Sequence, residues 1–121
     1  MGAVLSEICL DVNDLEAMER FWTAALELPA TRGEEPGAAY VEIALSPGLA
    51  LLLLEVPEPK TVKDRLHLDL SPRGCEQAEE VARLEGLGAH RVDVGQGSEA
   101  SWVVLADPEG NEFCVLRGRR D

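Results

Sequence analysis

The sequence predicts an α+β fold made of two βαβββ modules with one helix each. Two stretches, 5–12 and 65–70, alternate apolar and polar residues, and an amphipathic helical pattern follows each of them. After each helix the chain returns to short apolar stretches separated by Pro, Gly and Asp turns. We therefore expect an internal duplication within one domain, with a module at 1–56, a stiff Pro-rich linker at 57–62 and a second module at 63–121.

In the first half, Ile8, Leu10 and Val12 form the apolar side of the strand over 5–12. A helix then begins at Asn13 or Asp14, because both residue types cap helix N-termini. Its apolar stripe includes Trp22, which we expect to anchor the core, and Pro29 ends it. Three strands are expected after it, at 30–33, 39–45 and 49–56.

The second half repeats this order. Leu66, Leu68 and Leu70 form the apolar side of the strand over 65–70. A helix over 75–87 follows and ends at its glycines. The turn at 107–110 has Pro second and Gly fourth, as a type I turn prefers. Strands are expected at 91–94, 101–106 and 112–116, with a hairpin loop at 95–98.

Polar residues form a row on the first strand of each module. If the apolar side covers the helix, the opposite side carries Glu7, Cys9 and Asp11 in one half and Arg65, His67 and Asp69 in the other. Such rows are too polar for an ordinary core and suit a concave, partly wet surface that binds a ligand. The alternative is a sheet with one face in plain contact with solvent.

Composition excludes several functions. Lys and Arg number 11 against 23 Asp and Glu, and the formal net charge of −12 repels nucleic acid and anionic membranes while it favours cationic ligands. The longest apolar run, 49–54, is too short to cross a bilayer. Cys9, Cys75 and Cys114 form no C-x-x-C pair, so we expect reduced, mostly buried thiols and a cytoplasmic protein.

The repeat, the helix start Asn13-Asp14-Leu15 and the turn-strand Asp107-Pro108-Glu109-Gly110-Asn111-Glu112 together resemble the vicinal oxygen chelate superfamily. This superfamily includes glyoxalase I, bleomycin-resistance proteins and extradiol dioxygenases. The stretch Arg65-Leu66-His67-Leu68-Asp69-Leu70 and the later Trp102–Pro108 look like its small glyoxalase-like members. The resemblance implies a curved eight-stranded cup with one helix per module, usually completed in a homodimer.

The resemblance also implies where metal ligands would stand, since metal-dependent members place four inside the cup. The first position falls on Glu7, the third on His67, and the second on Leu54 or Glu55, between which alternation does not decide. The fourth falls on Cys114, with Glu112 two residues earlier on the same strand face. The family's usual residues are His or Gln, Glu, His and Glu, so this chain departs from the pattern.

Two ligand sets follow from that departure. If Glu55 and Glu112 serve beside His67 and Glu7, a site of two or three carboxylates and one His suits Mn²⁺, Ni²⁺ or Zn²⁺. A Cys114 thiolate with His67 favours Zn²⁺ instead. The alternative to both is a hydrogen-bonded polar cluster with no metal.

Three functions remain. The first is a homodimeric cup that sequesters a small, cationic ligand, as bleomycin-resistance proteins do, with no nucleic acid or membrane partner. The second is a divalent-metal-dependent lyase, isomerase or thiol transferase in which Glu7 and Glu112 move protons. The third is a dimeric accessory domain without a ligand. The expected ligand-binding residues, with Trp102 facing either the cup or a helix, are Glu7, Cys9, Leu54, His67, Asp69, Trp102, Glu112 and Cys114.

Overall fold

The computed structural model describes residues 1–97 and 100–118. Ser98 of the expected hairpin loop, Glu99 and the last three residues of the second module, 119–121, lie outside the described residues. The chain divides into two compact units, Met1–Pro59 and Lys60–Asp121, and this boundary falls inside the stretch 57–62 expected as the linker. Each unit is described by itself.

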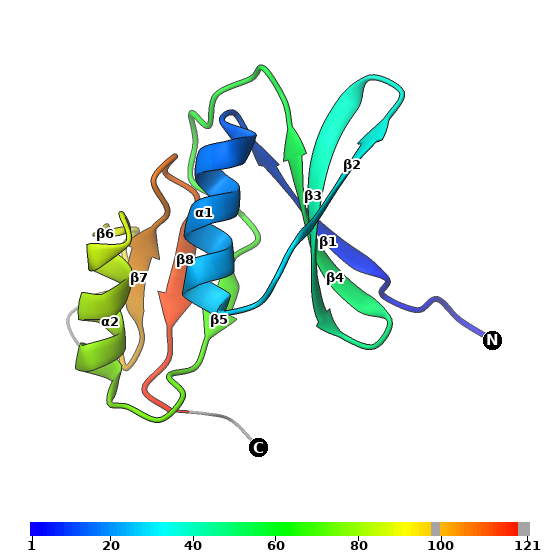
Figure 1. Ribbon diagram of the computed structural model, residues 1–121. Helices are drawn as coiled ribbons and strands as arrows, with labels where there is room; N and C mark the ends of the chain where they lie inside the picture. The colour runs from blue at the N-terminus through cyan, green and yellow to red at the C-terminus, as the bar shows by residue number, and fades with distance from the viewer. Residues whose placement is uncertain (98–99, 119–121) are drawn as a thin grey trace. The chain divides into compact units, whose positions relative to one another are not determined.

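Both units have the order βαβββ (Figure 1). The elements of the first are β1 (Glu7–Val12), α1 (Leu15–Leu26), β2 (Thr31–Glu35), β3 (Ala38–Ser46) and β4 (Leu49–Glu55). Those of the second are β5 (Leu68–Leu70), α2 (Gln77–Gly86), β6 (His90–Arg91), β7 (Val103–Ala106) and β8 (Glu112–Val115). The strand orders β1-β4-β3-β2 and β5-β8-β7-β6 are the same topology, so the predicted duplication is confirmed.

The first unit places its core on one face of its sheet. The buried side chains there alternate along neighbouring strands and are Val12, Val41, Ile43, Leu51 and Leu53. Helix α1 contacts β3 and β4 and buries Met18, Phe21 and Trp22, so Trp22 is the expected anchor. The side chain of Asp14 accepts a hydrogen bond from the Ala17 N–H at 3.0 Å and caps the helix.

The opposite face of the first sheet carries the predicted polar row. β1 and β4 are parallel, with Glu7 opposite Ala50, Cys9 opposite Leu52 and Asp11 opposite Leu54. All three residues of the β1 row are exposed, whereas Ile8 and Leu10 between them are half-buried. Alternation therefore predicted the two faces of this strand correctly.

In the second unit α2 lies along the sheet in Figure 1, and Phe113, Leu105, Val81 and Leu84 are buried in its core. The strand expected over 65–70 is shorter than predicted and begins only at Leu68. Leu66 is 72% exposed, so its place on an apolar strand face was a wrong prediction.

The cause of this shortening is a competing hydrogen bond. The Glu112 N–H, one residue before the β5–β8 ladder at Leu68 and Phe113, donates to the Asp64 carboxylate at 3.1 Å. The Glu112 N–H is therefore bonded to a side chain and is not available to a backbone carbonyl of a longer β5.

The turn between β7 and β8 is built as the sequence predicts. Asp107 is fully buried, and one of its carboxylate oxygens accepts from the N–H groups of Glu109 and Asn111 at 2.9 and 3.0 Å. Gly110 has φ +94°, which a residue with a side chain rarely adopts. This turn fixes the antiparallel register in which Val104 faces Cys114.

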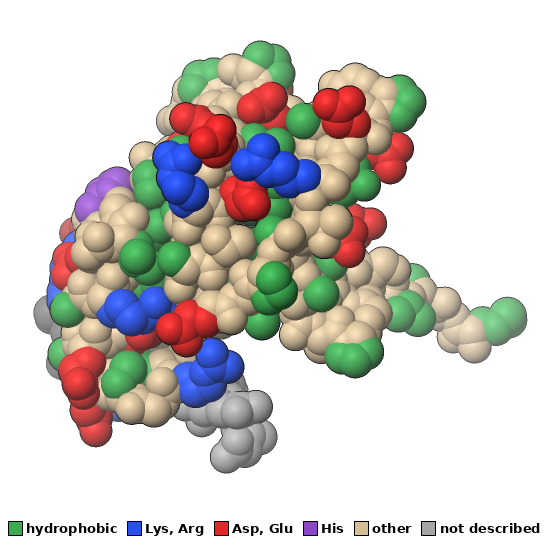
Figure 2. All heavy atoms as spheres, viewed as in Figure 1, with side chains coloured by type: hydrophobic (Ala, Val, Ile, Leu, Met, Phe, Trp, Pro, Cys, Tyr) green, Lys and Arg blue, Asp and Glu red, His purple; other side chains and the backbone are tan. Residues whose placement is uncertain are grey.

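No helix among residues 1–97 and 100–118 is long and apolar enough to span a membrane. Of the thiols, Cys114 alone is buried, whereas Cys9 and Cys75 are exposed, so the prediction of mostly buried thiols was wrong. Cys9 is exposed because it belongs to the polar face of β1. In the view of Figure 2, acidic and basic side chains stand close to one another at several places on the surface.

Candidate functional site

A hollow of about 660 Å³ lies in the second unit, and its lining residues come from the parts of the chain before residue 98 and after residue 99. Asp69, Val104 and Cys114 line it from the sheet face opposite Phe113 and Leu105, and His67 lines it from just before β5. A volume of this size holds a drug-sized ligand. Two members of the polar row predicted for this module, His67 and Asp69, therefore line this hollow, whereas Arg65 is not among its lining residues.

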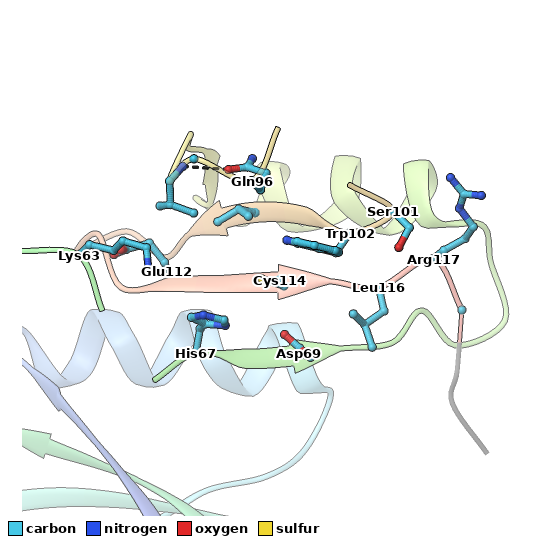
Figure 3. Close-up of a pocket in the computed structure, with 14 residues that line it drawn as sticks. Lys63, His67, Asp69, Gln96, Ser101, Trp102, Glu112, Cys114, Leu116 and Arg117 are labelled. Carbon is cyan, nitrogen blue, oxygen red and sulfur yellow. Dashed lines mark hydrogen bonds between the residues drawn. The ribbon is translucent and has the colours of Figure 1, made fainter. Parts of the chain in front are cut away.

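Three side chains converge on the floor of this hollow (Figure 3). Asp69 of β5 and Cys114 of β8 are direct partners in the parallel ladder, and His67 stands two residues before Asp69 on the same face. One ligand atom from each of the three side chains lies within 4.8 Å of the others. Nitrogen, oxygen and sulfur donors are thus gathered at one point, where they can bind a cation or a polar ligand group.

The Cys114 thiol is held in its neutral form in the absence of a metal. Burial raises the pKa of this thiol to about 11, and the charge of Asp69 and a hydrogen bond to the Asp69 carboxylate add to the effect. Lys63 partly opposes this rise in pKa. The free thiol is therefore a hydrogen-bond donor at neutral pH and a poor nucleophile.

Trp102 forms part of the wall of the hollow and is 41% exposed, so it faces the cavity rather than a helix. Its segment is tied to α2 by Gln77, whose side-chain amide donates to the carbonyl oxygens of Ser101 and Val115, both at 2.9 Å. The Gln77 side chain therefore fixes the backbone next to Trp102 and next to Leu116, and both of these residues line the hollow.

Glu112 lines one end of the hollow, but protein groups already engage its carboxylate. One oxygen accepts from the Asp64 N–H at 3.0 Å, and the other lies 2.5 Å from Lys60 Nζ. Burial alone would raise the pKa of Glu112, but the Lys60 ammonium and the Asp64 N–H outweigh burial and lower this pKa. The arrangement holds the 60–67 segment against β8 and suits an anchoring role better than proton transfer.

The remaining ligand-binding residues expected from the sequence belong to the first unit. Glu7, Cys9 and Leu54 share the polar face of the first sheet, Leu54 being half-buried and paired with Asp11. The sequence left open whether Leu54 or Glu55 points to this face, and the register selects Leu54. The part of Glu7, Cys9 and Leu54 in ligand binding stays a prediction.

Glu55 does not fit the predicted metal set. It pairs with Val12, on the opposite face from Glu7, and its carboxylate accepts from the Leu15 N–H at 3.4 Å. Glu7 pairs with Ala50, which stands five residues before Glu55 in β4, so Glu7 and Glu55 are offset by roughly 16 Å along the strands. Glu55 therefore stabilises the start of α1, where a negative charge is favourable, and cannot share an ion with Glu7.

Sequence reasoning missed several residues that line the hollow. Val104 and Leu116 lie on the Cys114 face and could have been found by extending the alternation along β7 and β8. Lys63, Gln96 and Arg117 line it from irregular segments, where no period indicates a direction. Lys63 and Arg117 stand at opposite ends of the hollow in Figure 3.

Many solved structures match this chain. The fosfomycin resistance protein FosX from Listeria monocytogenes is 19% identical, with a TM-score of 0.73 over 98% of this chain and 94% of that one. A YycE protein of unknown function from Bacillus subtilis, described as a putative glyoxalase/fosfomycin resistance protein, is 20% identical, with a TM-score of 0.72 over 97% and 91%. A glyoxylase/bleomycin resistance protein/dioxygenase domain from Frankia is 21% identical, with a TM-score of 0.68 over 98% and 100%.

These likenesses establish the fold, and their identities are too low to carry more. A mutant of the Listeria monocytogenes FosX has been solved with Mn(II) and 1S,2S-dihydroxypropylphosphonic acid. The comparison with curated proteins gives no match. The family model described as "Glyoxalase-like domain" matches residues 7–116. The chain therefore belongs to the glyoxalase-like domain family, a branch of the vicinal oxygen chelate superfamily.

Proposed function

We propose that this protein binds a small organic molecule in the hollow of the second unit, in a sequestering role of the kind found in drug resistance. The observation that carries the proposal is the cavity of about 660 Å³ with His67, Asp69 and Cys114 at its floor and Trp102 in its wall. A mostly apolar hollow with a few converging polar groups is the usual form of a small-molecule site.

The size of the cavity limits the ligand. A hollow of about 660 Å³ accommodates a molecule of a few hundred daltons. A whole glycopeptide such as bleomycin needs more surface than this hollow offers. We therefore favour a compact ligand that places a flat apolar part against Trp102 and a polar part at Asp69 and Cys114.

The charged side chains that line the hollow change the expectation, drawn from the net charge, that the ligand is a cation. Lys63 and Arg117 bring positive charge to the two ends, and Asp69 brings negative charge to the floor. The chain's net charge of −12 raises the local concentration of cations, but the hollow itself carries both signs. A zwitterionic or polar neutral ligand suits this lining at least as well as a cation.

Tryptophan fluorescence tests the proposal. Trp22 is 1% exposed and Trp102 is 41% exposed, so a ligand in the hollow changes mainly the emission of Trp102. We expect a compound from a panel containing fosfomycin, bleomycin and small aromatic amines to quench this emission saturably. Trp102→Ala should weaken binding of that compound, measured by calorimetry, about tenfold.

The matched control is Leu87→Ala, which removes an exposed apolar side chain at the end of α2, outside the hollow. This variant should bind as the wild type does. Equal losses in both variants, or a bound compound whose affinity does not depend on Trp102, would contradict the proposal.

The second candidate is a metal-dependent lyase, isomerase or thiol transferase, and the convergence of His67, Asp69 and Cys114 favours it. These three side chains fit a divalent ion, because they bring N, O and S donors together in a cavity with room for a substrate. Such an ion, when bound, supplies Lewis-acid polarisation of substrate oxygens. Trp102 would orient the substrate, and Lys63 and Arg117 would hold its anionic groups.

Proton transfer in that reaction needs a base. Glu112 is engaged by Lys60 and Asp64, and Glu7, the other carboxylate that the sequence predicts as a base, belongs to the first unit. The two functions separate on turnover: an enzyme converts the bound compound when a divalent ion is added, whereas a sequestering protein releases it unchanged.

A further inference from the structure

We infer that Gln77, the first residue of α2, is a positioning residue that keeps the Trp102 end of the hollow open and thereby selects ligands with a flat ring. It does so by ending the β7–β8 ladder one hydrogen-bonded pair early. The inference rests on the proposed function and deepens it, because it adds a chemical class of ligand and a residue outside the lining that controls which ligands fit.

The register of β7 and β8 shows where the ladder stops. Hydrogen-bonded and non-hydrogen-bonded pairs alternate along antiparallel strands, and the Asp107 N–H, which donates to the Asn111 carbonyl at 2.9 Å, marks one hydrogen-bonded pair. Counted from there, Val103 and Val115 form a hydrogen-bonded pair as well, and they are the last pair of the register.

A continued ladder would close this end of the hollow. Its next hydrogen-bonded pair would be Ser101 and Arg117, with the Ser101 carbonyl accepting from the Arg117 N–H. Trp102 and Leu116 would then stand directly opposite each other, where Cβ atoms are about 4.5–5.5 Å apart. Both belong to the strand face of Cys114 that lines the hollow, so a longer ladder would draw their side chains together.

In the structure the Ser101 carbonyl is bonded to Gln77 instead. The side-chain amide nitrogen of Gln77 donates to this carbonyl and to that of Val115, each at 2.9 Å. An amide nitrogen carries two N–H groups, so these two carbonyls use both of them. The ladder ends at Val103 and Val115, and Ser101 and Arg117 do not form the next pair.

The separated strand ends form one end of the hollow. The residues beside the last pair on both strands all line it, and they are Ser101, Trp102, Leu116, Arg117 and Gly118. Trp102 is 41% exposed, so part of its ring is open to a ligand (Figure 3). A flat ring can stack there, whereas a saturated group of the same size gains less from this end.

The helix that carries Gln77 is firmly attached to the sheet. Val81 and Leu84 of α2 are buried in the core, and the Glu76 N–H donates to the Glu79 carboxylate at 3.1 Å in the first turn. The Gln77 amide therefore reaches the two carbonyls from a fixed position. A change of this side chain acts on the strand ends without altering a residue of the lining.

Hydrogen exchange at the Arg117 amide, read by NMR on ¹⁵N-labelled protein, tests the inference without a ligand. Gln77→Glu replaces the amide by a carboxylate of nearly equal size, which accepts hydrogen bonds and cannot donate to the two carbonyls. The freed Ser101 carbonyl should then accept from the Arg117 N–H, so exchange of this amide should slow about tenfold. Ala82→Glu adds the same charge at an exposed position of α2 and should leave the exchange unchanged.

The binding test compares benzylamine with cyclohexylmethylamine by calorimetry. The two amines carry the same charge, so the ratio of their affinities does not depend on the charge that a variant adds. We expect the wild type and Ala82→Glu to prefer benzylamine about tenfold, because its flat ring stacks on Trp102. Gln77→Glu should abolish this preference, and so should Trp102→Ala.

The double variant Gln77→Glu/Trp102→Ala separates positioning from general damage. If Gln77 acts through Trp102, the double variant should show the same affinity ratio as Trp102→Ala alone. Circular dichroism checks that each variant folds, and Gln77→Met, which also removes both donors, replaces Gln77→Glu if that variant does not fold.

Two results would overturn the inference while the proposed function stands: an Arg117 amide that exchanges equally fast in wild type and Gln77→Glu, or a preference for benzylamine that survives in Gln77→Glu. A further change of the affinity ratio in the double variant would also contradict it. If no compound of the panel and neither amine binds the wild type, the proposed function fails and the ligand selectivity fails with it, while the Arg117 exchange still decides whether Gln77 ends the ladder.

Discussion

Cys114 differs from the other two cysteines in both burial and chemistry. It is buried against Asp69 with a thiol pKa raised to about 11, whereas Cys9 and Cys75 are exposed. At pH 8 only about one molecule in a thousand carries the Cys114 thiolate, because each pH unit below the pKa lowers that fraction tenfold.

Iodoacetamide at pH 8 should therefore modify Cys9 and Cys75 of the metal-free native protein and spare Cys114. Intact-mass spectrometry should show two added groups before unfolding and three after it. Modification of Cys114 as fast as of Cys75 would show that its thiol is neither protected nor neutral.

Lys60 and Glu112 form an ion pair whose loss leaves a buried charge. Their side chains are 22% and 8% exposed. Lys60→Met should lower the free energy of unfolding at pH 7 by about 2 kcal/mol, less than for a fully buried pair because water reaches Lys60.

The pH dependence of this loss follows from the lowered pKa of Glu112. A lowered folded-state pKa gives stability that is present above the unfolded value and disappears as pH falls through the folded value. The difference between Lys60→Met and the wild type, measured by urea unfolding, should therefore shrink below about pH 4. If the difference in unfolding free energy instead stays constant from pH 7 to pH 3, it arises from lost packing and not from the charge of Glu112.

Among the elements, the first turn of α2 controls the shape of the ligand wall. Gln77 holds the carbonyls of Ser101 and Val115 with one amide. Gln77→Met keeps the approximate size of the side chain and removes both hydrogen bonds. We expect a loss of about 1–2 kcal/mol in stability and a change in Trp102 emission.

The control is Arg83→Met, which removes the Arg83–Glu80 ion pair from the same helix without touching the wall. Its emission spectrum should match that of the wild type. If both variants change the emission equally, Trp102 responds to α2 as a whole and not to the Gln77 contacts.

The elements that the sequence predicted best are those with a long, clear period. β1 and α1 lie where alternation and the Asp14 cap place them, within about two residues. β5 was predicted three residues too long, since the period of Leu66, Leu68 and Leu70 carries no information about the Asp64 carboxylate that takes the Glu112 N–H. Side-chain competition for backbone donors is a tertiary effect.

The candidate site was predictable only in part for the same reason. Asp69 and Cys114 were found because they lie on strands, whose faces alternation assigns, and His67 because it keeps the same period just before β5. Their convergence into one donor cluster depends on the register between β5 and β8, which are separated in the chain by α2, β6 and β7. Glu55 was misassigned because β4 is apolar on both faces, so that no contrast marks which side is which.

For the whole molecule, the family likeness and the first sheet together predict a homodimer. Tyr40, Leu52 and Leu54 are half-buried neighbours on the face that carries the acidic β1 row. Light scattering should give twice the chain mass of 13.1 kDa at micromolar concentration. Leu52→Glu should shift this mass to that of the monomer if that face is the interface, and a monomeric wild type would refute the prediction.

The central claim is that ligands bind in the hollow of the second unit. Amide chemical shifts of ¹⁵N-labelled protein, recorded as a bound compound from the panel is added, test it most directly. The account predicts that the largest shifts cluster at Asp69, Trp102, Val104 and Cys114, with the amides of the first unit changing less. Saturable shifts confined to Glu7–Val12 and β4, with those four amides unmoved, would contradict it.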